Sequence, residues 1–231
     1  MTELVFALPV RGDLAQRKTF SSDCQNGKFR CSTRSPTNGV PYLQVKSPRR
    51  TYLLSPEIKI IWNETQTNLY DIEIEKDGQT LLRGIARGNS FTYTLPFPGR
   101  YRVFVAEVGE GSSGDSRNEF LPPGGIGFIL PQENARQEVR HIIENVSDPI
   151  AELIEREFLS DAIALIEERI EATENASERS RLYARLAIVY GLQYLPDFAS
   201  SALEKVAIED LEEELRQEVE AIRNWIELSL R

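Results

Sequence analysis

The composition of this 231-residue chain changes abruptly near Pro131. Thirteen of its fourteen glycines lie before that point, and only Gly191 lies after it. Residues 1–132 carry 16 Lys and Arg against 13 Asp and Glu, a net charge of +3, whereas residues 133–231 carry 11 against 23, a net charge of −12. Short apolar runs between turn residues precede the break, and apolar residues at helical spacing follow it. The sequence therefore predicts a two-domain α+β protein, with a β domain followed by a helical domain.

The predicted organisation has three parts. Residues 1–40 form an N-terminal arm that can be partly disordered, residues 41–132 form the β domain, and residues 133–231 form the helical domain. No apolar run approaches the roughly 20 residues that a membrane span needs. The net charge of −9 disfavours nucleic acid as a partner. The residues do not point to any cofactor or metal.

Strand signals recur at short intervals through the β domain. Within 70–75, Tyr and Ile alternate with Asp71, Glu73 and Glu75, which predicts one buried and one solvated face. Asp77-Gly78 is typical of a tight hairpin turn. The expected strands lie near residues 42–45, 52–54, 58–62, 70–75, 81–85, 91–93, 101–105 and 126–130.

Two segments of this region resemble the fibronectin type III and immunoglobulin-like domains. Ser55-Pro-Glu-Ile-Lys-Ile-Ile-Trp62 is similar to the second strand of those domains, with its core Trp. Leu95-Pro-Phe-Pro-Gly-Arg-Tyr101 is similar to the turn into the sixth strand, with Tyr101 in the tyrosine-corner position. The resemblance implies a β-sandwich in which Trp62 and Tyr101 are core residues and the Tyr101 hydroxyl bonds to backbone upstream.

The helical domain is predicted to contain six helices. Asp148, Asn175 and Asp210 are expected as N-caps, because each precedes a helical pattern and carries a short acceptor side chain. The helices are expected near residues 133–146, 149–157, 161–173, 177–194, 197–207 and 210–229.

Residues 177–207 resemble a tetratricopeptide repeat. Tyr183, Ala187 and Tyr190 fall at matching positions of its first helix, and Ala199 and Leu203 fall at those of its second. The resemblance implies antiparallel helical hairpins that bind a protein partner. Because the domain is acidic, we expect that partner to present a basic surface or peptide. The candidate partner-binding residues are Tyr183, Tyr190, Tyr194, Arg179, Arg181 and Arg185.

The location of the protein depends on its N-terminal residues. The apolar run Leu4–Val10 is similar to the end of a signal peptide, which favours the periplasm or envelope, whereas a complete N-terminus favours the cytoplasm. Cys24 and Cys31 flank the turn Asn26-Gly27. A disulfide between them is expected if the protein is exported, and free thiols if it stays in a reducing compartment.

The chain also resembles a group of uncharacterised cyanobacterial envelope proteins, which have no assigned activity. The matching elements are Ser47-Pro-Arg, Leu53-Leu54, Ile60-Ile-Trp62 and Gly125-Ile-Gly-Phe128.

The remaining candidate sites are weak. The acids around Gly109–Asn118 could bind calcium, but their spacing matches no calcium loop. Gly124–Gly127 is followed by strand residues, unlike a phosphate loop. His141 is expected at a helix surface. We therefore predict a non-enzymatic protein-interaction or scaffold protein of the bacterial envelope, with a carbohydrate- or small-ligand-binding sandwich and structural helices as the alternative.

Overall fold

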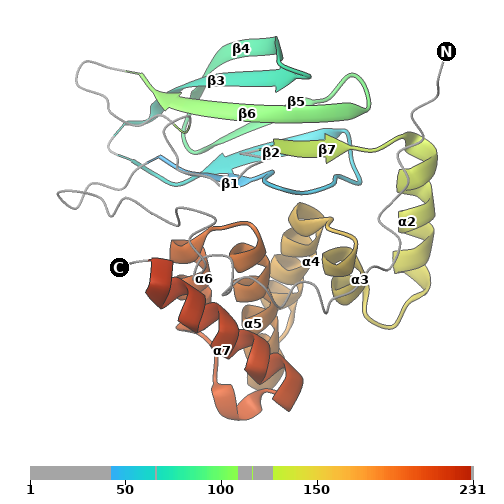
Figure 1. Cartoon of the computed structure of the whole chain (residues 1–231), viewed down its shortest axis with the longest axis vertical. Helices are drawn as coiled ribbons and strands as arrows, with labels where there is room; N and C mark the ends of the chain where they lie inside the picture. The colour runs from blue at the N-terminus through green and yellow to red at the C-terminus, as the bar shows by residue number, and fades with distance from the viewer. Residues whose placement is uncertain (1–42, 66, 109–115, 117–126, 230–231) are drawn as a thin grey trace. The chain divides into compact units, whose positions relative to one another are not determined.

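The computed structural model describes residues 43–65, 67–108, 116 and 127–229 (Figure 1). It confirms an α+β protein with two antiparallel sheets and a set of helices. The described residues up to Ser160 form one compact unit, and those from Asp161 onward form a second. The sequence predicted a division between residues 132 and 133, so the first unit extends further along the chain than expected.

The first unit contains two antiparallel sheets (Figure 1). The three-stranded sheet has the order β1 (Val45–Ser47), β2 (Glu57–Trp62) and β5 (Ser90–Thr94). The four-stranded sheet has the order β4 (Gln79–Arg87), β3 (Leu69–Lys76), β6 (Gly99–Glu107) and β7 (Gly127–Leu130). The strand predicted near residues 52–54 is wrong, since Tyr52 makes only an isolated bridge to Ile129.

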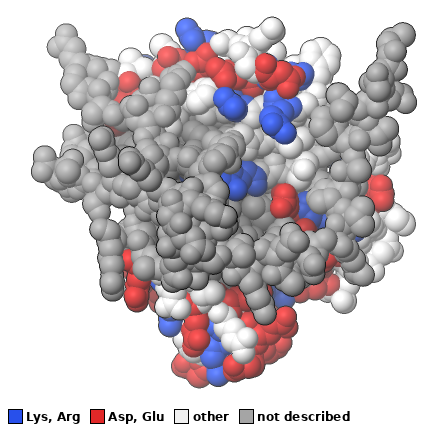
Figure 2. All heavy atoms as spheres, viewed as in Figure 1, with Lys and Arg blue, Asp and Glu red and all other residues white. Residues whose placement is uncertain are grey.

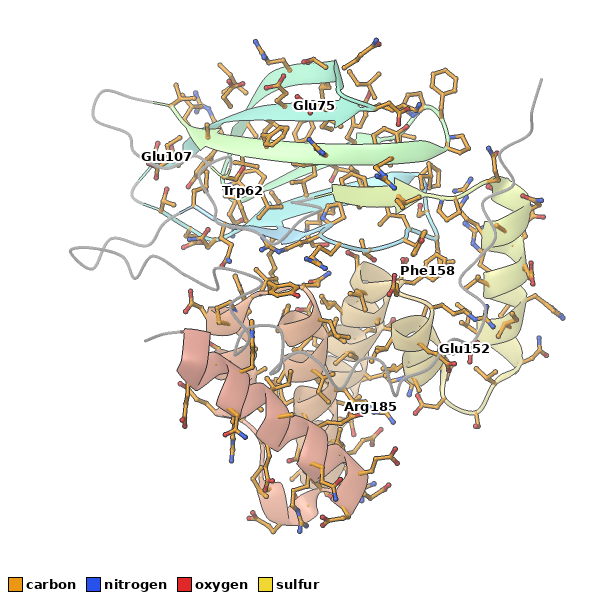
Figure 3. The ribbon with its side chains drawn as sticks, viewed as in Figure 1. Trp62, Glu75, Glu107, Glu152, Phe158 and Arg185 are labelled. Carbon is orange, nitrogen blue, oxygen red and sulfur yellow. The ribbon has the colours of Figure 1, made fainter. Side chains whose placement is uncertain are left out.

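The inward-facing residues of both sheets form one hydrophobic core. Ile58, Ile60 and Trp62 alternate inward on β2, as predicted. The Trp62 ring lies between the sheets, 5.1 Å from the Tyr70 ring in an edge-to-face arrangement (Figure 3). The prediction that Trp62 is a core residue is confirmed.

Tyr101 is also fully buried, as predicted. Its hydroxyl donates a hydrogen bond to the backbone carbonyl of Phe97, and its ring stacks on Phe128 with centroids 5.7 Å apart. The predicted hairpin is confirmed as well, because Asp77 and Gly78 both adopt positive φ angles between β3 and β4. Such angles match the twist of the two strands that this turn connects.

Two helices, α2 (Glu133–Asn145) and α3 (Pro149–Glu155), belong to the first unit. On α2, the side chains of Arg136 and Arg140 both donate hydrogen bonds to the carbonyl of Leu54, and both form ion pairs with Glu133. The N-cap prediction at Asp148 is confirmed, since its side chain accepts a hydrogen bond from the backbone N–H of Ala151 at 3.2 Å.

The residues after α3 explain why the first unit continues to Ser160. The backbone N–H of Tyr52 donates to the carbonyl of Glu157 at 2.9 Å. The Thr51 hydroxyl accepts from the backbone N–H of Ser160 at 3.1 Å. Phe158 is fully buried, and its ring centroid lies 5.8 Å from that of Tyr52 (Figure 3). These contacts join segments more than a hundred residues apart.

The second unit is helical. Its elements are most of α4 (Leu159–Ala172), α5 (Ala176–Leu192), α6 (Pro196–Leu203), a 3₁₀ turn η3 (Ile208–Asp210) and α7 (Glu213–Ser229). Asn175 caps α5 by accepting from the backbone N–H of Glu178, as predicted. The predicted cap at Asp210 is wrong, because Asp210 ends η3 and α7 begins three residues later.

Gly191 has a packing role in this unit. A Cβ atom added there would lie 2.5 Å from Cδ1 of Ile222 on α7. The absence of a side chain therefore allows α5 and α7 to approach closely. This contact accounts for the single glycine of the acidic half.

Candidate functional site

Tyr190 lies in the core of the helical unit. Only 3% of its surface is exposed, its hydroxyl donates to Oε1 of Glu167 at 3.2 Å, and its ring lies 5.6 Å from that of Phe198. Burial raises the pKa of Tyr190, and the negative charge of Glu167 raises it further. Because packing between helices occupies this ring, Tyr190 does not present a surface to a partner.

Tyr183 and Tyr194 are half-buried. The Lys205 ammonium lies 4.8 Å from the centroid of the Tyr183 ring, within the range of a cation–π contact. The Tyr194 ring contacts Trp225 edge to face at 6.1 Å. Both tyrosines therefore make contacts within the helical unit and expose only part of their rings.

The candidate arginines also contact their own unit. Arg179 donates to the carbonyl of Thr173 at 2.6 Å, and Arg181 donates to the carbonyl of Asp210 at 3.3 Å. These bonds connect the start of α5 to the preceding loop and to the end of η3. The six predicted partner-binding residues thus include one core residue and several that help to hold the helices together.

Arg185, labelled in Figure 3, is close enough to Glu218 of α7 to act on its charge. The pKa of Glu218 is raised because burial disfavours its charged form and Glu214 repels it, while Arg185 lowers it. Acidic side chains predominate where α7 begins, on the face shown in Figure 2. The local field of this helix end is therefore negative.

The sandwich carries the large hydrophobic side chains that the structure describes as exposed. These are Leu81 at 37%, Ile85 at 65% and Phe97 at 63% exposure. Leu81 and Ile85 lie on the outer face of β4, and Phe97 precedes β6. Sequence analysis missed this surface. The available signal was the alternation of odd- and even-numbered positions along residues 81–87. That alternation does not reveal which of the two faces points outward.

Glu73 corrects the prediction of a uniformly solvated acidic face on β3. It is only 5% exposed, and its Oε1 accepts hydrogen bonds from Thr80 at 2.7 Å and from Arg83 at 2.8 Å. The reason is the neighbouring strand, since Arg83 of β4 stands directly opposite Glu73 in the register. Asp71 and Glu75 stay partly exposed on the same face.

Several predicted features lie outside the described residues. They are Cys24 and Cys31 with their expected disulfide, the glycines at 124 and 125, and the acids Glu110, Asp115 and Glu119. Gly127 is described and begins β7, in accord with strand rather than phosphate-loop structure. His141 is exposed on α2, near the Asn145 side chain.

Within the part of the chain that the structure describes, no group of three or more His, Cys, Asp or Glu side chains is arranged to hold a metal ion. The same residues contain no helix with both the length and the apolar character that crossing a membrane requires.

Comparison with known protein families finds no family that matches this chain. Comparison with curated proteins finds no matching protein.

Proposed function

We propose that this chain is a non-enzymatic protein-interaction protein of the bacterial envelope. The sandwich is its binding module, with a fibronectin type III-like fold, and the helical unit has a tetratricopeptide-like arrangement. Three features support the sandwich assignment: the strand orders of the two sheets, the buried Trp62 and the hydrogen bond from the Tyr101 hydroxyl to backbone upstream.

The observation that carries the proposal is the outer face of β4. Ile85 and Leu81 expose aliphatic surface on one side of the strand, and Arg83 and Arg87 alternate with them. Burying apolar surface is favourable by about 25 cal/mol per Å². Arginine is also enriched in protein interfaces. This combination is typical of a surface that binds another protein.

The test is retention of envelope proteins on the immobilised full-length chain. We compare the wild type with Ile85→Asp and with Thr92→Asp, a matched control at an exposed position of β5 on the other sheet. Proteins retained by the wild type and by Thr92→Asp should be lost from Ile85→Asp. Equal retention by all three chains would contradict the proposal that this face binds protein.

A carbohydrate- or small-ligand-binding sandwich is the second candidate. The exposed Phe97 ring favours it, because exposed aromatic side chains offer a flat apolar face next to polar groups. Glycan-array binding by the full chain that is lost in Phe97→Ala would support this candidate over protein binding.

The acidic charge of the helical unit has a different role in the proposal. It attracts a basic region of the partner, separate from the segment that the sandwich binds, and raises the association rate, with Tyr183 and Tyr194 as partly exposed aromatic contacts. Because salt shortens the Debye length from about 10 Å at 0.1 M to 3 Å at 1 M, this attraction should weaken strongly with salt. Cell fractionation with N-terminal sequencing of the native protein tests the envelope location.

A further inference from the structure

Strand β4 lies at one end of the four-stranded sheet, so among the described strands only its β3 side is paired. Two hydrogen bonds define which backbone groups face β3. The N–H of Gly88 donates to the carbonyl of Asn68 at 2.9 Å, which makes these two residues a hydrogen-bonded pair. The N–H of Val108 donates to the carbonyl of Leu69 at 3.0 Å, so the backbone groups of Leu69, the residue after Asn68, point toward β6. Hydrogen-bonded and non-hydrogen-bonded pairs alternate along an antiparallel ladder.

In the register of β3 and β4, this alternation assigns the even-numbered residues of β4 to the bonds with β3. The odd-numbered residues Arg83, Ile85 and Arg87 therefore direct their N–H and C=O groups toward the open edge. An open strand edge is a template for another extended segment. Leu81 is excluded from the regular stretch, because a β-bulge shifts the register beside it.

On the outer face of β4, the side chains of Arg83, Ile85 and Arg87 place an apolar group between two cations. Ile85 is 65% exposed, and the Arg83 side chain is 64% exposed while paired with Glu73. Arg87 is exposed, and among the described residues no carboxylate forms an ion pair with it. An added strand would meet these groups at a spacing of two residues.

Gly84 lies between these residues. A Cβ atom added there would meet nothing within 4 Å, so the packing of the sandwich does not require glycine. Glycine in a strand interior weakens the strand and often marks a position where another backbone comes close.

From this geometry we propose that β4 binds an extended acidic segment of a partner protein, which adds to its open edge as an antiparallel strand. The inference rests on the proposed protein-binding function and specifies its mode. Carboxylates of the added strand stand opposite Arg83 and Arg87, and an aliphatic side chain stands opposite Ile85. Opposite charges in cross-strand positions stabilise such pairing.

A second copy of this chain fits the edge less well than an acidic segment. Two-fold pairing centred on Arg83 places that arginine against its own copy, and like charges directly opposite one another are destabilising. Pairing centred on Gly84 places Arg83 opposite Ile85 and Leu81 opposite Arg87. Neither arrangement gives an arginine a carboxylate, whereas an acidic strand supplies one to each.

The experiment measures amide hydrogen exchange and binding in the full-length chain. The probe is the peptide Thr-Glu-Thr-Val-Thr-Glu-Thr, and the controls are the same peptide with Lys in place of Glu and with an N-methyl group on Val. The first peptide should slow exchange at the amides of Arg83, Ile85 and Arg87. Loss of one backbone hydrogen bond should weaken binding of the N-methyl peptide about tenfold, and the Lys peptide should bind about fivefold more weakly.

Protein variants test the charge pattern. Arg87→Glu should abolish the preference for the Glu peptide over the Lys peptide, because Arg83 still attracts a carboxylate while the acid at position 87 repels one. Lys59→Glu makes the same change of charge at an exposed position of β2 on the other sheet and should leave binding unchanged.

Three results would overturn the inference. Equal binding of the N-methyl peptide would mean contact through the face of β4 rather than strand addition. Protection of the same amides that grows with protein concentration in the absence of peptide would identify a second copy as the occupant. The third result is no peptide binding at all. In that case the retention experiment separates the two proposals. If the wild type retains proteins that Ile85→Asp does not, strand addition is wrong but the protein-binding function stands. If both chains retain the same proteins, both proposals are wrong.

Discussion

Replacing Phe158 with alanine tests whether the residues after α3 are part of the sandwich unit. Phe158 is fully buried, and its ring packs against that of Tyr52. Removal of a buried phenylalanine side chain costs about 3–5 kcal/mol, because apolar contacts are lost and a cavity remains. That is a large part of the roughly 5–15 kcal/mol by which a domain is stable.

The assay uses the two tryptophans as separate reporters. Trp62 lies in the sandwich core and Trp225 lies on α7 in the helical unit. In a Trp225→Phe background, urea unfolding followed by Trp62 fluorescence reports the sandwich alone. With an m-value of about 2 kcal/mol/M, Phe158→Ala should lower the Trp62 midpoint by about 1.5–2.5 M urea.

Two variants serve as controls for this prediction. Phe97→Ala removes an exposed ring of the same type and should change stability by no more than about 0.5 kcal/mol. Phe158→Leu keeps most of the buried volume and should cost less than Phe158→Ala. An unchanged Trp62 midpoint in Phe158→Ala would refute the assignment of Phe158 to the sandwich unit.

Three further predictions concern stability. Tyr101→Phe removes the hydrogen bond to the Phe97 carbonyl and should lower the free energy of unfolding by about 0.5–1.5 kcal/mol in urea titrations. Gly84→Ala meets no neighbouring atom and should raise the free energy of unfolding by about 0.4–1 kcal/mol, so a loss of stability would contradict the described packing. The pKa of Tyr190 in the folded state is raised above its ordinary value of 10.0. The stability that the protonated Tyr190 contributes is therefore complete below pH 10. Above that pH the free energy of unfolding should fall by about 1.4 kcal/mol per pH unit. Tyr190→Phe should flatten that alkaline slope, measured by Trp225 fluorescence; an unchanged slope would mean that Tyr190 is not buried.

Sequence reasoning could predict only part of the candidate binding residues. The tyrosines and arginines of α5 were identified by their helical spacing. Spacing along one helix does not show which of them other helices cover. Tyr190 enters the core because Glu167 of α4 and Phe198 of α6 pack against it. The β4 surface was missed because an edge strand is defined by its place in the sheet.

The sequence by itself determined the features that depend on neighbouring residues. These include the Asp77-Gly78 turn, the caps at Asp148 and Asn175, and the inward alternation that ends at Trp62. Each depends on residues a few positions apart, whose preferred backbone angles and hydrogen bonds are local.

Only the tertiary structure decided which residues are brought together across long stretches of chain. The burial of Glu73 depends on Arg83 across the β3–β4 ladder, and the end of the first unit depends on Thr51 and Tyr52 meeting Glu157. The open edge of β4 likewise depends on the order of all the described strands in their sheets. The physical reason is that burial and strand pairing are properties of the assembled contacts, and one local pattern is compatible with many such assemblies.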